Sequence, residues 1–184
     1  MTVAEPPPDA RWQALLVGVA SNAHGDDPGF VQSLNSQAEL ARAHGAAHTV
    51  IGHAGLVAEV KRITGGAMVP VVYDSVGKDT WNASLDSLAP LGLMASYGNA
   101  SGPVGPVDVS ILAAKGSLYL TRPTLATYTA KRADLEKTAA DLFDVVLKGA
   151  VKIEVNQTFP LKDAAAAHVA LESRNTTGST VLVP

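Results

Sequence analysis

Three short runs of aromatic, small and polar residues are the part of this sequence best suited to chemistry. They are Tyr73–Gly77 (YDSVG), Tyr97–Gly102 (YGNASG) and Thr121–Pro123 (TRP), and each follows an apolar run. Glycine lets a planar group or a phosphate approach the backbone, where free N–H groups can donate hydrogen bonds to it. A tyrosine in such a place can stack on a flat ring. Each run alone is most simply a turn, but the three together predict a site for a nucleotide or another flat ring.

Three better-known patterns of phosphate-binding and catalytic loops are absent from the sequence. The glycines Gly18, Gly25 and Gly29 lack the Gly-x-Gly-x-x-Gly spacing of dinucleotide-binding turns, and no Gly-x-x-x-x-Gly-Lys-[Ser/Thr] motif occurs. Ser75 and Ser96 each have a glycine two residues later, but neither has the first glycine of the Gly-x-Ser-x-Gly elbow of serine hydrolases. Acyl transfer is therefore not expected.

The histidines do not have the spacing of a metal site. His44, His48 and His53 are four and five residues apart, but Gly45 and the β-branched run Thr49–Ile51 would interrupt a helix that could align them. No carboxylate completes the set, and the chain has no cysteine. We therefore expect no metal site, no disulfide and no cysteine nucleophile.

The composition is typical of a globular domain. A length of 184 residues suits one domain, or one domain with appended pieces, and 47% hydrophobic residues exclude wholesale disorder. The 14 Lys and Arg stand against 17 Asp and Glu, and no basic block occurs, so nucleic-acid binding is not expected. No apolar run is long enough to span a bilayer, and the acidic, proline-rich start is unlike a signal peptide. We expect a cytoplasmic protein that does not contact membranes.

The residues around the three runs alternate between helical and strand patterns. From residue 32 onward, helices are predicted over 36–44, 56–63, 81–88, 132–148 and 160–173, and strands over 49–51, 69–73, 91–97, 117–121, 153–155 and 180–183. The run 69–73 (VPVVY) has no polar alternation, which is typical of a strand buried on both faces. Strands separated by helices predict an α/β fold with a Rossmann-like, doubly wound, mostly parallel sheet. Ligands bind at the carboxyl ends of such strands, where the three runs lie.

Six longer segments form an ordered set over residues 36–184. They are 71–81 (VVYDSVGKDTW), 92–102 (GLMASYGNASG), 115–123 (KGSLYLTRP), 160–163 (PLKD), 171–174 (LESR) and 181–184 (VLVP). The set resembles the zinc-free quinone oxidoreductases, the zeta-crystallin-like branch of the medium-chain dehydrogenase/reductase superfamily. The resemblance implies NADPH as the cofactor and hydride transfer from it, without zinc, to a quinone or similar small electrophilic carbonyl.

The resemblance also implies where the cofactor would be contacted, but it identifies no catalytic residue. The segment 97–99 would lie along the cofactor with its aromatic ring next to the adenine side, the segment 122–123 would lie near the nicotinamide, and the arginine at 174 would reach the phosphates. The implied cofactor-binding residues are Ser75, Tyr97, Gly98, Asn99, Arg122, Pro123 and Arg174.

The chain departs from this family at its N-terminal side. Residues 1–31 resemble neither the GroES-like substrate domain of the family nor its glycine-rich turn, so they are left unassigned. We expect residues 32–184 to form a partial NAD(P)-binding domain, incomplete at its N-terminal side, in a truncated chain with impaired activity. The alternative is a non-catalytic module that binds a nucleotide or dimerises. Relatives dimerise through an edge strand, and the match to 117–121 implies a homodimer here.

Overall fold

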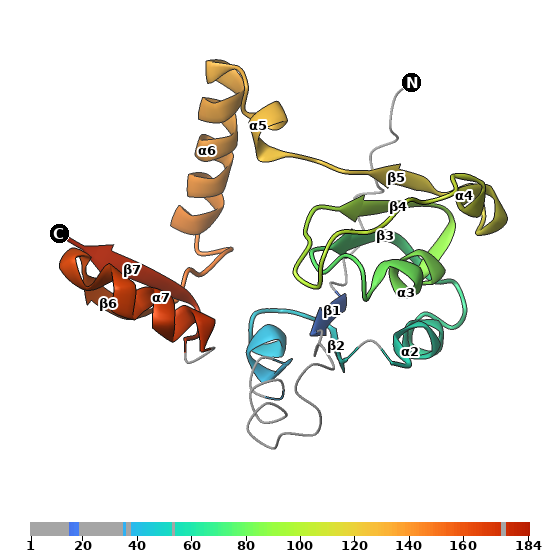
Figure 1. Ribbon diagram of the computed structural model, residues 1–184, viewed down its shortest axis with the longest axis horizontal. Coiled ribbons are helices and arrows are strands. Elements are labelled where there is room, and N and C mark those ends of the chain that lie inside the picture. Colours follow the sequence, from blue (N-terminus) through green and yellow to red (C-terminus); the bar gives the residue numbers. More distant parts are fainter. Residues whose placement is uncertain (1–14, 19–34, 36–37, 53, 174–175) are drawn as a thin grey trace. The chain divides into compact units, whose positions relative to one another are not determined.

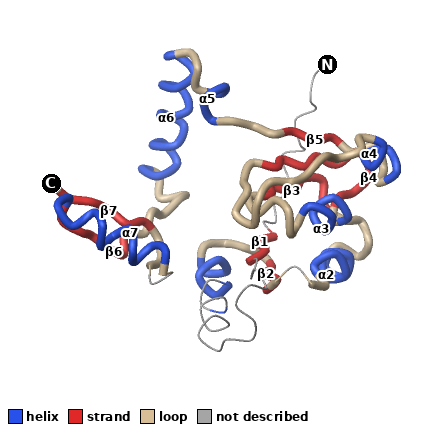
Figure 2. The backbone as a smooth tube through the Cα atoms, viewed as in Figure 1, coloured by secondary structure: helices blue, strands red, loops and turns tan. Residues whose placement is uncertain are grey.

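The computed structural model describes residues 15–18, 35, 38–52, 54–173 and 176–184 (Figures 1 and 2). Its contacts divide the chain into two units, Met1–Thr124 and Leu125–Pro184. The first unit contains β1 (Leu15–Gly18), β2 (His48–Ile51), α2 (Leu56–Ile63), β3 (Val69–Asp74), α3 (Trp81–Asp86), β4 (Leu88–Ser96), α4 (Ser110–Ala114) and β5 (Tyr119–Thr121). The second contains α5 (Leu125–Tyr128), α6 (Arg132–Leu147), β6 (Val155–Pro160), the 3-10 turn η2 (Leu161–Asp163), α7 (Ala164–Glu172) and β7 (Ser179–Val183). The domain boundary expected at residue 32 lies outside the described residues.

All the described strands pair in parallel, which confirms the predicted α/β class. They form three separate ladders, β1–β2, β3–β4–β5 and β6–β7, within the part of the chain that is described. Each strand-to-strand connection inside the β3–β4–β5 sheet carries a short helix, as parallel pairing requires.

The helix predicted over 56–63 is confirmed as α2, and its sequence explains both its packing and its end. Leu56 and Val60 lie one turn apart and are buried on the same face. Thr64 follows the helix and donates from Oγ1 to the carbonyl of Val60 at 2.8 Å. Gly65 and Gly66 then take positive φ angles of 60° and 91°, a conformation that favours glycine and stops a helix. In the helix predicted over 36–44, the described residues 38–43 are also helical.

The hydrophobic core of the first unit lies where α3 meets the β3–β4–β5 sheet (Figure 1). Leu85 of α3 and Met94 of β4 are almost fully enclosed, and Leu88 and Leu118 complete the buried cluster. Burying side chains of this size is the main source of stability for so small a sheet. The core therefore fixes α3 against the strands whose ends carry the candidate site.

Several predictions for this sheet are wrong in detail. The helix predicted through Leu88 ends at Asp86, and β4 begins at Leu88, ahead of the predicted start. The reason is a bulge around Pro90: the pairing with β3 shifts register there, and Leu91 takes a φ of 63°. The segment 69–73 is not buried on both faces, because Tyr73 is 75% exposed, whereas Val72 packs against the core and Asp74 bonds to Ser84 of α3.

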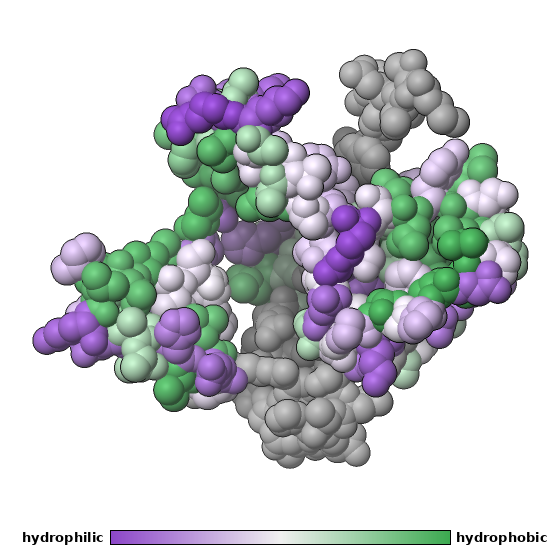
Figure 3. Space-filling model, turned by 45° about the horizontal axis from the view of Figure 1, so that its top comes forward, coloured by the Kyte–Doolittle hydropathy of each residue, from purple (hydrophilic) through white to green (hydrophobic). Residues whose placement is uncertain are grey.

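The second unit buries little of its apolar surface. Helix α7 packs on β6 and β7, and its Ala167 is the one buried residue in the described part of this unit. Helix α6 has the predicted apolar stripe, and its own unit leaves the stripe exposed: Leu147 is 87% exposed, and Phe143 is exposed as well. Figure 3 shows such apolar side chains at the surface. No helix among the described residues is both long and apolar enough to cross a bilayer.

The boundaries of two predicted elements in this unit are also wrong. The strand predicted over 153–155 begins only at Val155 and runs on to Pro160. The helix predicted from Pro160 begins at Ala164, after the 3-10 turn. Pro160 is the last strand residue, with φ −57° and ψ 141°, so its extended backbone lies outside the helix.

Candidate functional site

The three chemically interesting runs lie together at one edge of the β3–β4–β5 sheet, as predicted. The register pairs Asp74 with Ser96, and it pairs Ala95 with Thr121. The three strands are parallel and in step, so Ser75, Tyr97 and Arg122 each follow the end of a strand at the same edge.

Two of these runs are joined into one structure, which we call the double loop and define as residues 75–78 and 97–102. Backbone hydrogen bonds connect its two halves, and one more connects the second half to Asp74, the residue just before the first half. These are Tyr97 N–H to Asp74 O at 2.8 Å, Ala100 N–H to Ser75 O at 3.3 Å, Ser101 N–H to Val76 O at 2.9 Å and Lys78 N–H to Gly102 O at 3.1 Å. The Ser101 hydroxyl also donates to Val76 O at 2.9 Å. The halves therefore hold each other in place.

Glycine is required at two positions because the halves approach so closely. A Cβ atom on Gly98 would lie 2.0 Å from the carbonyl oxygen of Ser75. A Cβ atom on Gly77, whose φ is 91°, would lie 2.7 Å from the carbonyl oxygen of Gly102. A Cβ atom at either distance would overlap a backbone oxygen, so any other residue would force the halves apart.

Asp74 lies beneath the double loop and is only 4% exposed. Its Oδ1 accepts hydrogen bonds from the N–H groups of Val76 at 2.8 Å and Gly77 at 2.9 Å. Its Oδ2 accepts from the hydroxyls of Thr80 at 2.8 Å and Ser84 at 2.6 Å. Burial raises the pKa of Asp74, but these four hydrogen bonds together outweigh burial and lower the pKa below its ordinary value.

The expectation that free N–H groups of these turns donate to a ligand is wrong for three residues of the double loop. Val76 and Gly77 direct their N–H groups to the Asp74 carboxylate, and Lys78 directs its N–H to Gly102. These three N–H groups are not available to a phosphate, and the buried, negatively charged Asp74 carboxylate would repel one. The side chains of Ser75, Tyr97 and Asn99 remain exposed and suit a flat group, and the exposed Lys78 adds one positive charge beside them.

Arg122 connects the end of β5 to the double loop. Its Nη1 donates to the carbonyl oxygens of Ser96 at 2.8 Å and Gly98 at 3.1 Å. Pro123 follows and is half-buried. The structure thus brings together six of the seven residues implied to contact a cofactor, whereas Arg174 lies outside the described residues.

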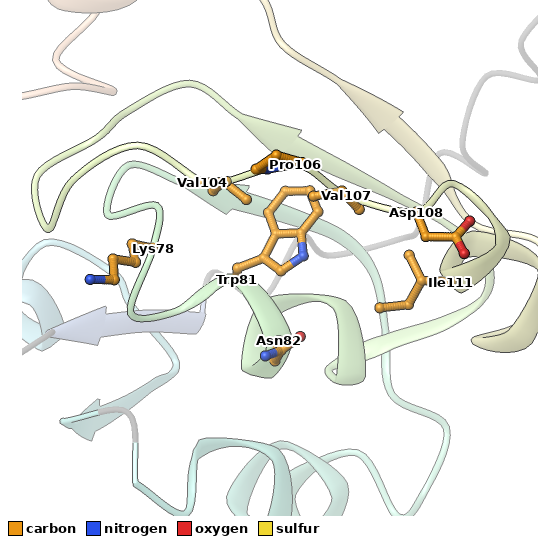
Figure 4. A pocket seen from close by; sticks show the side chains of 9 residues that line it. Lys78, Trp81, Asn82, Val104, Pro106, Val107, Asp108 and Ile111 are labelled. Atoms are coloured by element: carbon orange, nitrogen blue, oxygen red, sulfur yellow. The ribbon is translucent and has the colours of Figure 1, made fainter.

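Two cavities open beside the double loop, and both are lined by Trp81, Val104, Gly105 and Val107. The first, of about 330 Å³, is also lined by Ser96, Asn99, Leu120 and Arg122. The second, of about 360 Å³, is also lined by Lys78, Asn82, Asp108 and Ile111. In Figure 4 the Trp81 indole lies against Val104, Pro106 and Val107. Both cavities fall at the small end of the range for ligand sites.

Sequence reasoning missed the roles of Trp81, Asp74 and the segment 103–108 in the site. The sequence analysis places Trp81 in a predicted helix and in the family-like segment 71–81, and Asp74 in the first of the three runs, but assigns no role to either side chain. The dipeptides Gly102-Pro103 and Gly105-Pro106 were the available signal for the segment, because they mark a loop next to a strand end. Among the described residues, no three His, Cys, Asp or Glu side chains lie close enough to hold a metal ion.

Comparison with known proteins gives the family. A family model described as zinc-binding dehydrogenase matches residues 44–182. A quinone oxidoreductase of Pseudomonas aeruginosa is 52% identical over 149 residues, which are 80% of this chain and 46% of that protein. A 2-haloacrylate reductase of a Burkholderia species is 47% identical over 154 residues, which are 83% of this chain and 46% of that protein.

A solved structure agrees with these relatives. The crystal structure of Escherichia coli quinone oxidoreductase complexed with NADPH matches with a TM-score of 0.74 and 48% identity, over 81% of this chain and 47% of that one. The chain thus spans about half the length of the relatives that it matches. The resemblance to quinone oxidoreductases seen in the sequence is confirmed, and the chain belongs to the zinc-binding dehydrogenase family.

Proposed function

We propose that this chain binds NADPH at the carboxyl edge of the β3–β4–β5 sheet and serves hydride transfer from NADPH to a quinone or similar small electrophilic carbonyl. The observation that carries the proposal is the double loop, which presents Ser75, Tyr97 and Asn99 beside a cavity lined by Arg122. Similarity to the E. coli enzyme, whose structure holds NADPH, supports the choice of cofactor.

The residues present fit the flat ring and the sugar of this cofactor better than they fit its phosphates. The Tyr97 ring is 52% exposed and can stack on a flat ring, while the Asn99 amide and Ser75 hydroxyl can form hydrogen bonds to a base or a sugar. Gly77 and Gly98 let the two halves of the double loop pack closely, which holds these side chains in place. The phosphates need other donors, for which Arg174 is the candidate. NADPH itself supplies the hydride when it is bound.

The remaining features of the proposed function concern metal, assembly and location. We propose a reaction that needs no zinc, since the sequence has no cysteine to act as a ligand. We propose a homodimer paired along β5, the last strand of its sheet, whose Tyr119 is 53% exposed. We also propose a cytoplasmic location, which is consistent with a zinc-free reaction and with a homodimer.

Fluorescence titration of the purified chain with NADPH tests the proposed function. We expect saturable binding that is weakened about tenfold by Tyr97→Ala, because stacking of one ring contributes on the order of 1–3 kcal/mol. Tyr128→Ala, which changes an exposed tyrosine of the other unit, is the matched control and should leave binding unchanged. No saturable binding, or equal losses in both variants, would refute the proposal.

A further inference from the structure

Asp74 connects three parts of the first unit through separate groups. Its carboxylate binds the backbone of the double loop at Val76 and Gly77, and it binds α3 through Ser84 and the preceding Thr80. Its backbone carbonyl accepts from Tyr97 N–H at 2.8 Å, and from the next N–H along the chain at 3.3 Å. One residue thus touches both halves of the double loop and the helix that packs beneath it.

The carboxylate is suited to this place because all four of its neighbours are donors. Asp74 is only 4% exposed, so water cannot easily replace a lost acceptor oxygen. An asparagine would keep one acceptor oxygen for Val76 and Gly77, but its NH₂ would face the hydroxyls of Thr80 and Ser84, which would have to turn away from their present acceptor. The connection to α3 depends on the second carboxylate oxygen.

We propose that Asp74 is the positioning residue of the candidate nucleotide site, rather than a contact of the nucleotide. Its carboxylate accepts from the N–H groups of Val76 and Gly77 and also from hydroxyls at α3. It thereby fixes the position and orientation of Ser75 on one half of the double loop. Through its backbone carbonyl it fixes Tyr97 on the other half. The inference rests on the proposed function for its consequence, which is cofactor affinity, but not for its structural part.

Amide hydrogen exchange on the full chain tests the structural part. Asp74→Asn should accelerate exchange of the Lys78, Tyr97 and Ser101 amides at least about tenfold more than exchange within β3 and β4, because local opening is then less costly than global unfolding. Leu85→Ala is the matched control: it removes core packing and should accelerate all these amides together. Uniform acceleration in Asp74→Asn, or none, would overturn the proposal.

Two further variants keep the test decisive if Asp74→Asn does not fold. Ser84→Ala and Thr80→Val each remove one donor to Oδ2 and leave the charge in place. Each should also loosen the double loop selectively, to a smaller extent than Asp74→Asn. Loss of protection spread evenly over β3, β4 and the double loop in both variants would overturn the proposal.

NADPH affinity tests the consequence for the site. At equal folded fraction, Asp74→Asn should weaken NADPH binding about tenfold, or about 1.4 kcal/mol, whereas Leu85→Ala should leave it unchanged. Equal affinity in Asp74→Asn and the unmodified chain would overturn the positioning role. If the unmodified chain binds no NADPH, the proposed function fails, and the exchange measurements alone then decide what Asp74 does.

Discussion

At the scale of the residue, the close approach of Gly98 to Ser75 gives the most demanding steric requirement in the site. A methyl group on Gly98 would lie 2.0 Å from a backbone oxygen that also accepts the Ala100 N–H. Since neither atom belongs to a flexible side chain, the two halves of the double loop would have to separate.

We therefore expect Gly98→Ala to lower the free energy of unfolding by about 1–3 kcal/mol, as overpacking does, and to weaken nucleotide binding. Gly105→Ala is the control, because a Cβ there has no atom within 4 Å. Chemical denaturation of both variants measures the effect. Equal stability of the two variants would contradict the geometry described for the double loop.

The buried charge of Asp74 predicts a pH dependence with a definite sign. Hydrogen bonds lower its pKa in the folded chain below the ordinary value of 3.8, so the unfolded chain binds the proton more readily. The stabilisation is therefore complete above pH 3.8 and is lost as the pH falls through the lower, folded-state pKa.

Denaturation curves between neutral and acidic pH, compared between the unmodified chain and Asp74→Asn, measure this contribution. We expect the stability difference between the two proteins to be constant near neutral pH and to shrink only in the acidic range. A difference that changes mainly between pH 6 and 8 would point to histidines instead.

At the scale of the element, the bulge in β4 stores local strain. Leu91 is 64% exposed and has a φ of 63°, which costs a residue with a Cβ roughly 1–2 kcal/mol. Its N–H donates to Gly116 O at 2.9 Å, which holds the bulge in this conformation.

Leu91→Gly should therefore stabilise the chain by about 0.5–1 kcal/mol, despite the extra freedom of glycine in the unfolded state. Val109→Gly, at an exposed position with φ −62°, is the control and should destabilise it. The melting temperatures of the two variants, compared with that of the unmodified chain, measure these effects. A lower melting temperature for Leu91→Gly would show that the bulge is not strained at that residue.

Periodicity predicted the helices and strands that the local sequence determines, and it failed where tertiary contacts determine them. Helix α2 was predictable because the spacing of Leu56 and Val60 indicates a helix and the glycines that follow indicate where it ends. The bulge at Pro90 was not predictable, because it depends on a hydrogen bond to Gly116, 26 residues from the proline. The role of Asp74 was partly visible in retrospect, since Thr80 and Ser84 are four residues apart and share the helix face beneath it.

At the scale of the whole molecule, the two units differ in how much of their apolar surface is buried. The first unit has a buried core under the candidate site, whereas in the described part of the second Ala167 alone is buried, and the rest of that unit does not cover the α6 stripe. Sequence patterns predict which face of a helix is apolar, but they do not show whether another surface covers it. Among the described residues, the candidate cofactor contacts all lie in the first unit.

Chemical-shift mapping of the full chain by NMR during an NADPH titration tests the central claim most directly. The account predicts saturable shifts concentrated in the amides of the double loop, residues 75–78 and 97–102, and around Arg122. Amides of α6 and of the β6–β7 ladder should stay unchanged, which controls for non-specific association. The absence of saturable shifts, or shifts centred in the second unit, would contradict the assignment of the site to the carboxyl edge of β3–β4–β5.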